Sequence, residues 1–216
     1  MAVGDVDVRL RGYVEGEIVP RYDAFDGGHG REHVITVIEQ SLLLARYYDV
    51  DVDMVYAIAA YHDVGLVGGR ELHHIVSGEI LRADKRLREW FDDAQIEVMA
   101  QAVADHRASN VDEPRSIYGK IVAEADRIID GDTIVCRAIQ YGLSHYPHYD
   151  KEEHYARFVE HMKEKYSEEG YLKLWIPQSP NSERLVQFRQ LLKDSKQLRA
   201  KFDATWDDLA ERYYHS

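Results

Sequence analysis

Two polar residues of this sequence lie where helical spacing predicts a buried apolar face. His106 follows Val103 by three residues, and Asp126 follows Val122 by four, so each shares a helix face with an apolar neighbour. A buried carboxylate that has no partner costs on the order of several kcal/mol, which an ion pair, protonation or a metal ion relieves. These positions therefore indicate a buried polar site.

The segment around residue 62 shows the same pattern with two adjacent side chains. His62 shares a face with Val55 and Ala59, and Asp63 follows directly where the helix is expected to end. Further upstream, His33 begins an apolar helix. We prefer it to His29, which lies in a Gly-rich loop.

Together these residues form a set suited to binding metal. Imidazoles and carboxylates bind divalent transition metals such as Mn, Fe, Co, Ni or Zn, and Mg is a further option. His74 and His106 could complete a second metal position, with Asp63 as the bridging carboxylate. The sequence thus predicts one or two ions, held by His33, His62, Asp63, His74, His106 and Asp126.

Helices must position these residues, because apolar residues recur at steps of three and four and no series of alternating strands is evident. The fold class expected is all-α, a helical bundle with a C-terminal helical extension. We predict a metal-binding core over 1–142 and an extension over 143–216 packed on it. Helices are expected over residues 32–48, from a cap at Asp53 onward, and over 74–83, 93–106 and 117–129.

Composition narrows the class of protein. The 216 residues are 45% hydrophobic and 31% charged, which is typical of globular chains, and the net charge of -12 argues against duplex nucleic acid as a partner. Cys136 is the only cysteine, so a cysteine-based zinc site is excluded. No apolar run is long enough for a membrane span, and we expect a cytoplasmic protein without a membrane partner.

The order of these residues resembles the HD superfamily of metal-dependent phosphohydrolases. The segments AAYHDVG and EADRI are similar to its two most recognisable motifs, and the resemblance covers about residues 29–142. HHIVSGEIL is similar to a ligand segment of HD-GYP phosphodiesterases, in which a ligand His precedes Gly by four positions. That alignment selects His74 over its competitor His73, and ADHRAS places His106 as the sixth ligand.

The sequence also departs from that subtype. It has no GYP tripeptide, and Asp105 stands where the HD-GYP type has a second adjacent histidine. Both differences argue against a cyclic-dinucleotide phosphodiesterase of that kind and against a third metal.

The resemblance implies hydrolysis of a small phosphate ester or nucleotide by a metal-activated water. Besides Asp63, the carboxylates of Asp105 or Glu124 could assist proton transfer. Cations near the motifs would suit a phosphate group, and we select Arg70, Arg107 and Lys120, although each could instead pair with a local acid.

Two other functions stay open. Some HD proteins with a similar six-ligand pattern hold two irons and use oxygen to cleave C–C or C–P bonds, as inositol oxygenases do. A catalytically silent, metal-stabilised binding module is the third option. The tail's aromatic residues could close a pocket or form a homodimer interface: Tyr141, Tyr146, Tyr149, Tyr155, Tyr171 and Trp175.

Overall fold

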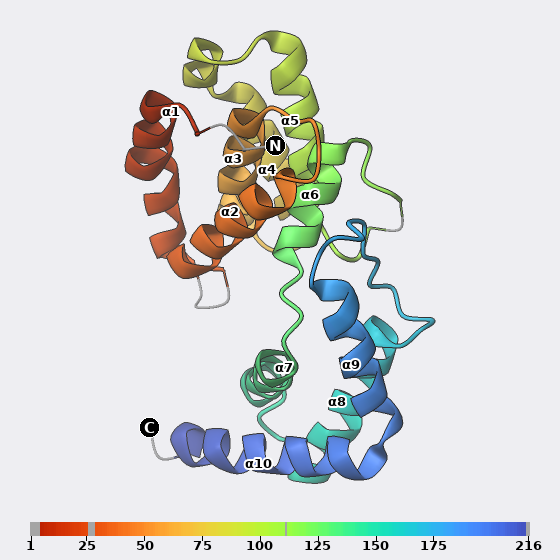
Figure 1. The fold of residues 1–216 in the computed structure, drawn as a ribbon. Helices are drawn as coiled ribbons and strands as arrows, with labels where there is room; N and C mark the ends of the chain where they lie inside the picture. Colours follow the sequence, from red (N-terminus) through yellow and green to blue (C-terminus); the bar gives the residue numbers. More distant parts are fainter. Residues whose placement is uncertain (1–4, 26–28, 111, 215–216) are drawn as a thin grey trace. The chain divides into compact units, whose positions relative to one another are not determined.

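The structure is a computed structural model that describes residues 5–25, 29–110 and 112–214, the last four by their backbone alone. Every regular element within these residues is a helix, which confirms the all-α fold class (Figure 1). The α-helices are α1 (Val8–Tyr13), α2 (Arg31–Ala45), α3 (Val52–Tyr61), α4 (His73–Ala83), α5 (Asp93–Asp105), α6 (Ile117–Asp126), α7 (Gly131–His145), α8 (Lys151–Tyr166), α9 (Asn181–Lys193) and α10 (Ser195–Tyr214).

Shorter helical turns join some of these helices. A π-helix, η1 (Val14–Ile18), and three 3-10 helices, η2 (Val19–Ala24), η3 (Val64–Gly68) and η4 (Lys85–Glu89), complete the set of described elements. None of the described helices is both long and apolar enough to cross a membrane.

The chain divides into two compact units. The first comprises Met1–Arg127 together with Leu174–Ser179, and the second comprises Ile128–Lys173 and Pro180–Ser216. The chain therefore passes from one unit to the other between residues 127 and 128 and again at 173–174 and 179–180, whereas the predicted division falls after residue 142. The predicted packing of an extension on the core stays a prediction.

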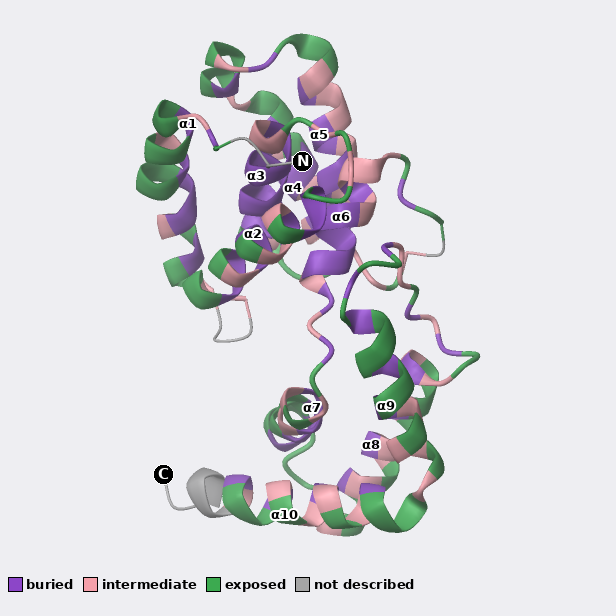
Figure 2. Cartoon of the chain, in the orientation of Figure 1, coloured by how far each residue is buried: buried purple, intermediate pink, exposed green. Residues whose placement is uncertain are grey.

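Helix α3 is the centre of the first unit and contacts α2, α4, α5 and α6 (Figure 1). All residues from Met54 to Tyr61 are buried, so this helix is apolar on every side (Figure 2). Its N-terminus is capped by Asp51, whose side chain accepts from the amides of Asp53 and Met54. The predicted cap at Asp53 was therefore wrong by two residues.

The surrounding helices follow the predicted ranges closely at their starts. Asp92 caps α5 in a reciprocal capping box with Gln95, and Ser116 caps α6. Helix α6 ends at Asp126, three residues before its predicted end, because Arg127 leaves the helical conformation at φ -82° and ψ 78°. Asp126 thus lies at a helix terminus.

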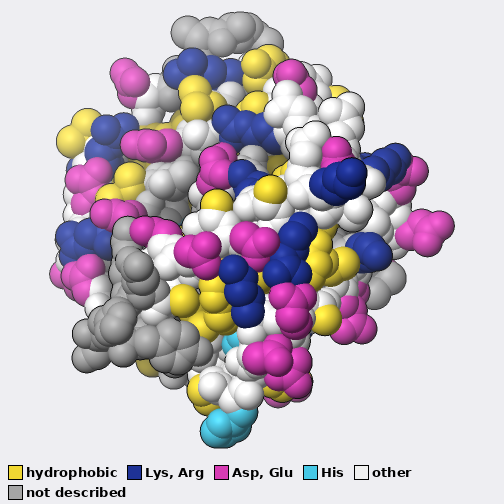
Figure 3. Space-filling model, turned by 90° about the horizontal axis from the view of Figure 1, so that it is seen from below, with side chains coloured by type: hydrophobic (Ala, Val, Ile, Leu, Met, Phe, Trp, Pro, Cys, Tyr) yellow, Lys and Arg dark blue, Asp and Glu magenta, His cyan; other side chains and the backbone are white. Residues whose placement is uncertain are grey.

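The second unit packs α7 against α8 and α10, and α9 against α8 and α10. Its core is aromatic, with the Phe158 and Phe202 rings 5.3 Å apart and Trp206 stacked on Phe202 at 5.7 Å. Acidic and basic side chains are interspersed over the face that Figure 3 presents.

Candidate metal centre

Four predicted ligands, one from α2, two from the end of α3 and one from the end of α6, lie close together. The Nε2 atom of His33, on α2, lies 3.2 Å from Nε2 of His62 and 3.1 Å from Oδ1 of Asp126. Oδ2 of Asp63 lies 3.4 Å from the same His62 nitrogen and 3.8 Å from that of His33. The structure therefore brings His33, His62, Asp63 and Asp126 together as one group of ligand atoms.

The second oxygen of Asp63 faces a different pair of histidines. Its Oδ1 atom lies 3.2 Å from Nε2 of His73 and 3.4 Å from Nε2 of His106, and these two nitrogens are 3.3 Å apart. Asp63 is thus shared by two groups that could each hold an ion, His33–His62–Asp63 and Asp63–His73–His106. This is the arrangement expected of a bridging carboxylate.

Three of the four imidazoles are oriented in the same way. The Nδ1 atoms of His62, His73 and His106 lie 2.8, 2.7 and 2.6 Å from the carbonyl oxygens of Ala59, Arg70 and Val103, each three residues earlier. Donation to a carbonyl keeps the proton on Nδ1 and leaves the lone pair of Nε2 directed at the cluster, as in metal-ligating histidines.

These residues fit a metal ion. Facing lone pairs on neighbouring Nε2 atoms repel one another unless a proton or a cation lies between them. Ligand atoms about 2.1 Å from one ion lie about 3.0 to 3.4 Å from each other in octahedral or tetrahedral coordination, and most of the distances here fall in or near that range. The donor set of imidazoles and carboxylates suits a divalent transition metal.

The pKa shifts of the residues in the cluster also fit a bound cation. Burial lowers the pKa of His62, but the nearby charges of Asp63 and Asp126 outweigh it and raise this pKa to about 9. Burial raises the pKa of Asp63, yet His62, His106 and His73 hold it well below its usual range. The Asp63 carboxylate therefore stays ionised, and its negative charge favours a positive charge among the facing nitrogens.

A glycine allows helix α4 to approach the cluster. A Cβ atom on Gly65 would lie 2.3 Å from the carbonyl oxygen of His73 and 2.5 Å from the amide nitrogen of Ser77. The Gly65 amide also donates to Oγ of Ser77 at 2.8 Å. Close contact between η3 and the start of α4 therefore places His73 beside Asp63.

The structure brings His73, rather than the predicted His74, to Asp63. Successive residues on a helix point about 100° apart, so only one of the two can face the cluster. His74 is also buried, with its ring 5.5 Å from that of His73, but its Nδ1 atom has no hydrogen-bond partner in the described part of the chain. Burial, together with His106, His73 and Arg107, lowers its pKa to about 4.

The carboxylates selected for proton transfer are engaged in other contacts. Asp105 binds the guanidinium of Arg115, with Nη2 to Oδ1 at 2.7 Å, and accepts the Arg115 amide. Glu124 is fully buried and accepts the amide of Trp175 at 2.7 Å. Glu124 lies two residues before Asp126 and therefore points to another side of α6. There its carboxylate accepts hydrogen bonds from the backbone of the segment Leu174–Ser179.

The selected cations have contacts of their own at the surface. Nη1 of Arg107 donates to the carbonyl of Glu71 at 2.5 Å, Lys120 forms an ion pair with Glu113, and Nη2 of Arg70 lies 2.9 Å from Nδ1 of His29. The carbonyl of Arg70 also accepts from His73, and Arg107 follows His106 in the chain. These two arginines therefore flank the second ligand group.

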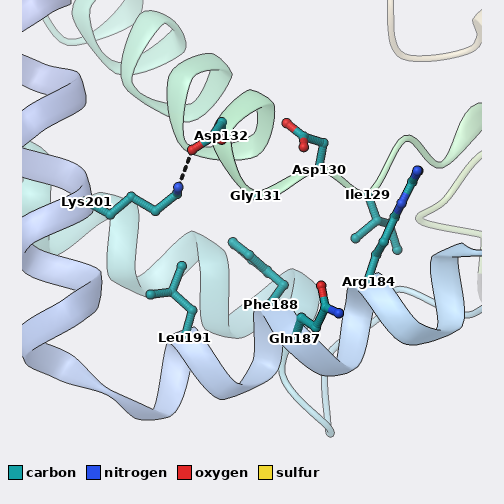
Figure 4. A pocket seen from close by; sticks show the side chains of 9 residues that line it. All are labelled: Ile129, Asp130, Gly131, Asp132, Arg184, Gln187, Phe188, Leu191 and Lys201. Carbon is teal, nitrogen blue, oxygen red and sulfur yellow. Dashed lines mark hydrogen bonds and ion pairs between the residues drawn. The ribbon is translucent and has the colours of Figure 1, made fainter.

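The second unit contains a cavity of about 440 Å³ between the start of α7 and helices α9 and α10 (Figure 4). Phe188 and Leu191 supply its apolar floor. Three of its charged groups are engaged, because Lys201 pairs with Asp132 and Asp130 caps α7 by accepting the Thr133 amide, and Arg184 also lines the cavity. We assign no chemistry to it.

The comparisons with known proteins agree with the metal centre. Residues 30–129 match a family model, that of the HD domain. Over this segment the chain is therefore similar to the HD domain, and the segment contains every residue of the ligand cluster. No curated protein and no solved structure matches the chain.

Proposed function

We propose that this protein is a metal-dependent phosphohydrolase that acts on a small phosphate ester or a nucleotide. The observation that carries the proposal is the position of Asp63, whose two oxygens face two separate pairs of histidines. A shared carboxylate between two ligand groups is suited to a pair of divalent ions acting on one phosphoryl group.

The ligand residues divide between two positions. His33, His62 and Asp126 would hold the first ion, His73 and His106 the second, and Asp63 would contact both. Divalent ions bound there would supply an activated water and neutralise charge on the phosphoryl oxygens.

Two arginines beside the ligand cluster would bind the phosphate group of the substrate. Arg70 and Arg107 flank His73 and His106, and their guanidinium groups would contact the phosphate by charge-assisted hydrogen bonds. Lys120 is held by Glu113 and is not part of this proposal.

The test combines metal content with two kinds of turnover. The purified full chain is loaded with Mn²⁺ or Co²⁺ and assayed on an aryl phosphate and a bis-aryl phosphate, and separately for oxygen uptake with Fe²⁺. We expect phosphate-ester turnover that is lost in Asp63→Ala and kept in the matched control Asp93→Ala, whose carboxylate is 84% exposed.

Three results would contradict the proposal. Ester turnover that Asp63→Ala leaves unchanged would refute the assigned site. Oxygen consumption by a di-iron form without ester turnover would identify the oxygenase, because such enzymes share this ligand set. Bound metal without either kind of turnover would identify the catalytically silent binding module.

A further inference from the structure

Helix α3 ends abruptly at the two adjacent ligands His62 and Asp63. In a continuing helix the amide of Asp63 would donate to the carbonyl of Ala59, four residues earlier. Nδ1 of His62 contacts that carbonyl at 2.8 Å instead. The chain then turns at Asp63, with φ -114° and ψ 5°, and enters η3. The Asp63 amide therefore needs another acceptor.

That acceptor is the hydroxyl of Tyr22, which comes from η2 about forty residues earlier. The Asp63 amide donates to the Tyr22 oxygen at 3.1 Å, and the hydroxyl itself donates to the carbonyl of Ala60 at 2.9 Å. Tyr22 is fully buried, and its ring lies 6.1 Å from the His62 ring and edge-on to Phe25 at 5.5 Å. The Tyr22 hydroxyl thus bonds to the backbone before and after the point where α3 ends.

These contacts leave the Tyr22 hydroxyl no direct part in chemistry. Its only proton is donated to Ala60, so it has none to give to a substrate. Its effect on the ligands must therefore pass through the backbone of residues 60 to 63.

We infer that Tyr22 is a positioning residue for the metal centre, whose hydroxyl fixes the backbone turn at His62–Asp63 so that the Asp63 carboxylate faces both ligand groups. The inference rests on the proposed function, since it assumes that this cluster binds metal. Without the hydroxyl, a buried amide and a buried carbonyl would lose their partner, and the turn would shift to satisfy them.

The test compares Tyr22→Phe with Tyr61→Phe in the full chain. Tyr61 is also fully buried, and its hydroxyl donates to Asp84 at 2.5 Å, so the control removes one buried hydroxyl from the same helix end. Both variants are titrated with Co²⁺ by calorimetry and by the visible spectrum of the bound ion, and their folding is checked by thermal unfolding.

We expect Tyr22→Phe to weaken Co²⁺ binding by about 10- to 100-fold and to change the cobalt spectrum, as losses of groups that orient ligands do. Tyr61→Phe should keep the affinity within about threefold and leave the spectrum unchanged, even where its thermal stability falls. Wild-type affinity and spectrum in Tyr22→Phe would overturn the inference while leaving the proposed function intact.

Two further outcomes are decisive. If the wild type binds no Co²⁺, the metal centre fails and the role of Tyr22 fails with it. If Tyr22→Phe does not fold, p-aminophenylalanine placed at position 22 keeps the ring and a donor to the Ala60 carbonyl but offers the Asp63 amide a poor acceptor. A weaker and spectrally altered cobalt site in that variant supports the inference, and an unchanged site overturns it.

Discussion

Each unit of this protein buries a histidine almost completely, but the two lie in opposite environments. His62 faces Asp63 and Asp126, and its pKa is raised to about 9. His154, on α8, is 2% exposed, lies between the rings of Tyr149 and Trp206, and has no hydrogen-bond partner on either nitrogen among the described residues. Its pKa is lowered, first by burial and then by Arg157.

The difference shows what makes a buried histidine a candidate ligand. Burial is common to both residues, so it does not distinguish them. The distinguishing features are a carboxylate opposite Nε2 and a carbonyl that accepts from Nδ1, which His62 has and His154 lacks.

The largest effect is expected when His62 and His154 are each replaced by alanine and the metal affinities of the two variants are compared. His62→Ala is expected to weaken Co²⁺ binding by more than about 100-fold, above the range for residues that only orient ligands, and to abolish turnover. His154→Ala should bind Co²⁺ as the wild type does, although its unfolding free energy falls. Equal affinities in both variants, measured by calorimetry, would contradict the distinction.

Gly65→Ala tests the contact that places His73. The added methyl would meet the backbone of α4, which has to move away from η3 and take His73 with it. We expect a loss of about 2 kcal/mol in unfolding free energy and fewer ions bound per chain, read by denaturant titration and elemental analysis. As the control, Gly68→Ala meets no atom within 4 Å and should bind as many ions as the wild type.

The pH dependence of metal binding follows from the raised pKa of His62. A proton occupies its imidazole up to about pH 9 in the metal-free protein, and a metal must displace it. Affinity should therefore rise about tenfold per pH unit between pH 7 and 9, with about one proton released. Calorimetry in two buffers of different ionisation enthalpy measures that proton, and binding without proton release would contradict the account.

The smallest effect is expected in the second unit. Because the pKa of His154 is lower in the folded state than the ordinary 6.5, the unfolded state binds a proton first as the pH falls. This contribution to stability is present above about pH 6.5 and is lost below it.

His154→Phe should remove that acid sensitivity. It should also stabilise α8 by about 1 kcal/mol at neutral pH, since it replaces an unpartnered polar ring by an apolar one. Hydrogen exchange of α8 at pH 5 and pH 8 measures both effects. His161, whose pKa burial also lowers, would keep a residual pH dependence.

The sequence was a good guide wherever the signal is local. His106 and Asp126 share helix faces with apolar residues, and the helical spacing that revealed them needs no knowledge of tertiary structure. The all-α fold class follows from the same spacing and is confirmed. The choice between His73 and His74 is different, because it depends on how closely α4 packs against Gly65 of η3.

Other parts of the site depend on residues far away in the chain. Glu124 lies two positions before Asp126 and resembles a catalytic carboxylate in sequence, yet it binds a segment fifty residues later. Tyr22 contacts Asp63 from about forty residues upstream, and no helical period or motif marks it. Such contacts arise only once the helices have packed.

Asp63 is the centre of this account, and anomalous X-ray diffraction from crystals of the cobalt-loaded protein tests its role most directly. The account predicts two cobalt peaks about 3.5 to 4 Å apart, one on each side of the Asp63 carboxylate, one near His33 and His62 and the other near His73 and His106. A crystal with no cobalt at Asp63, or with cobalt bound only elsewhere in the chain, would contradict it.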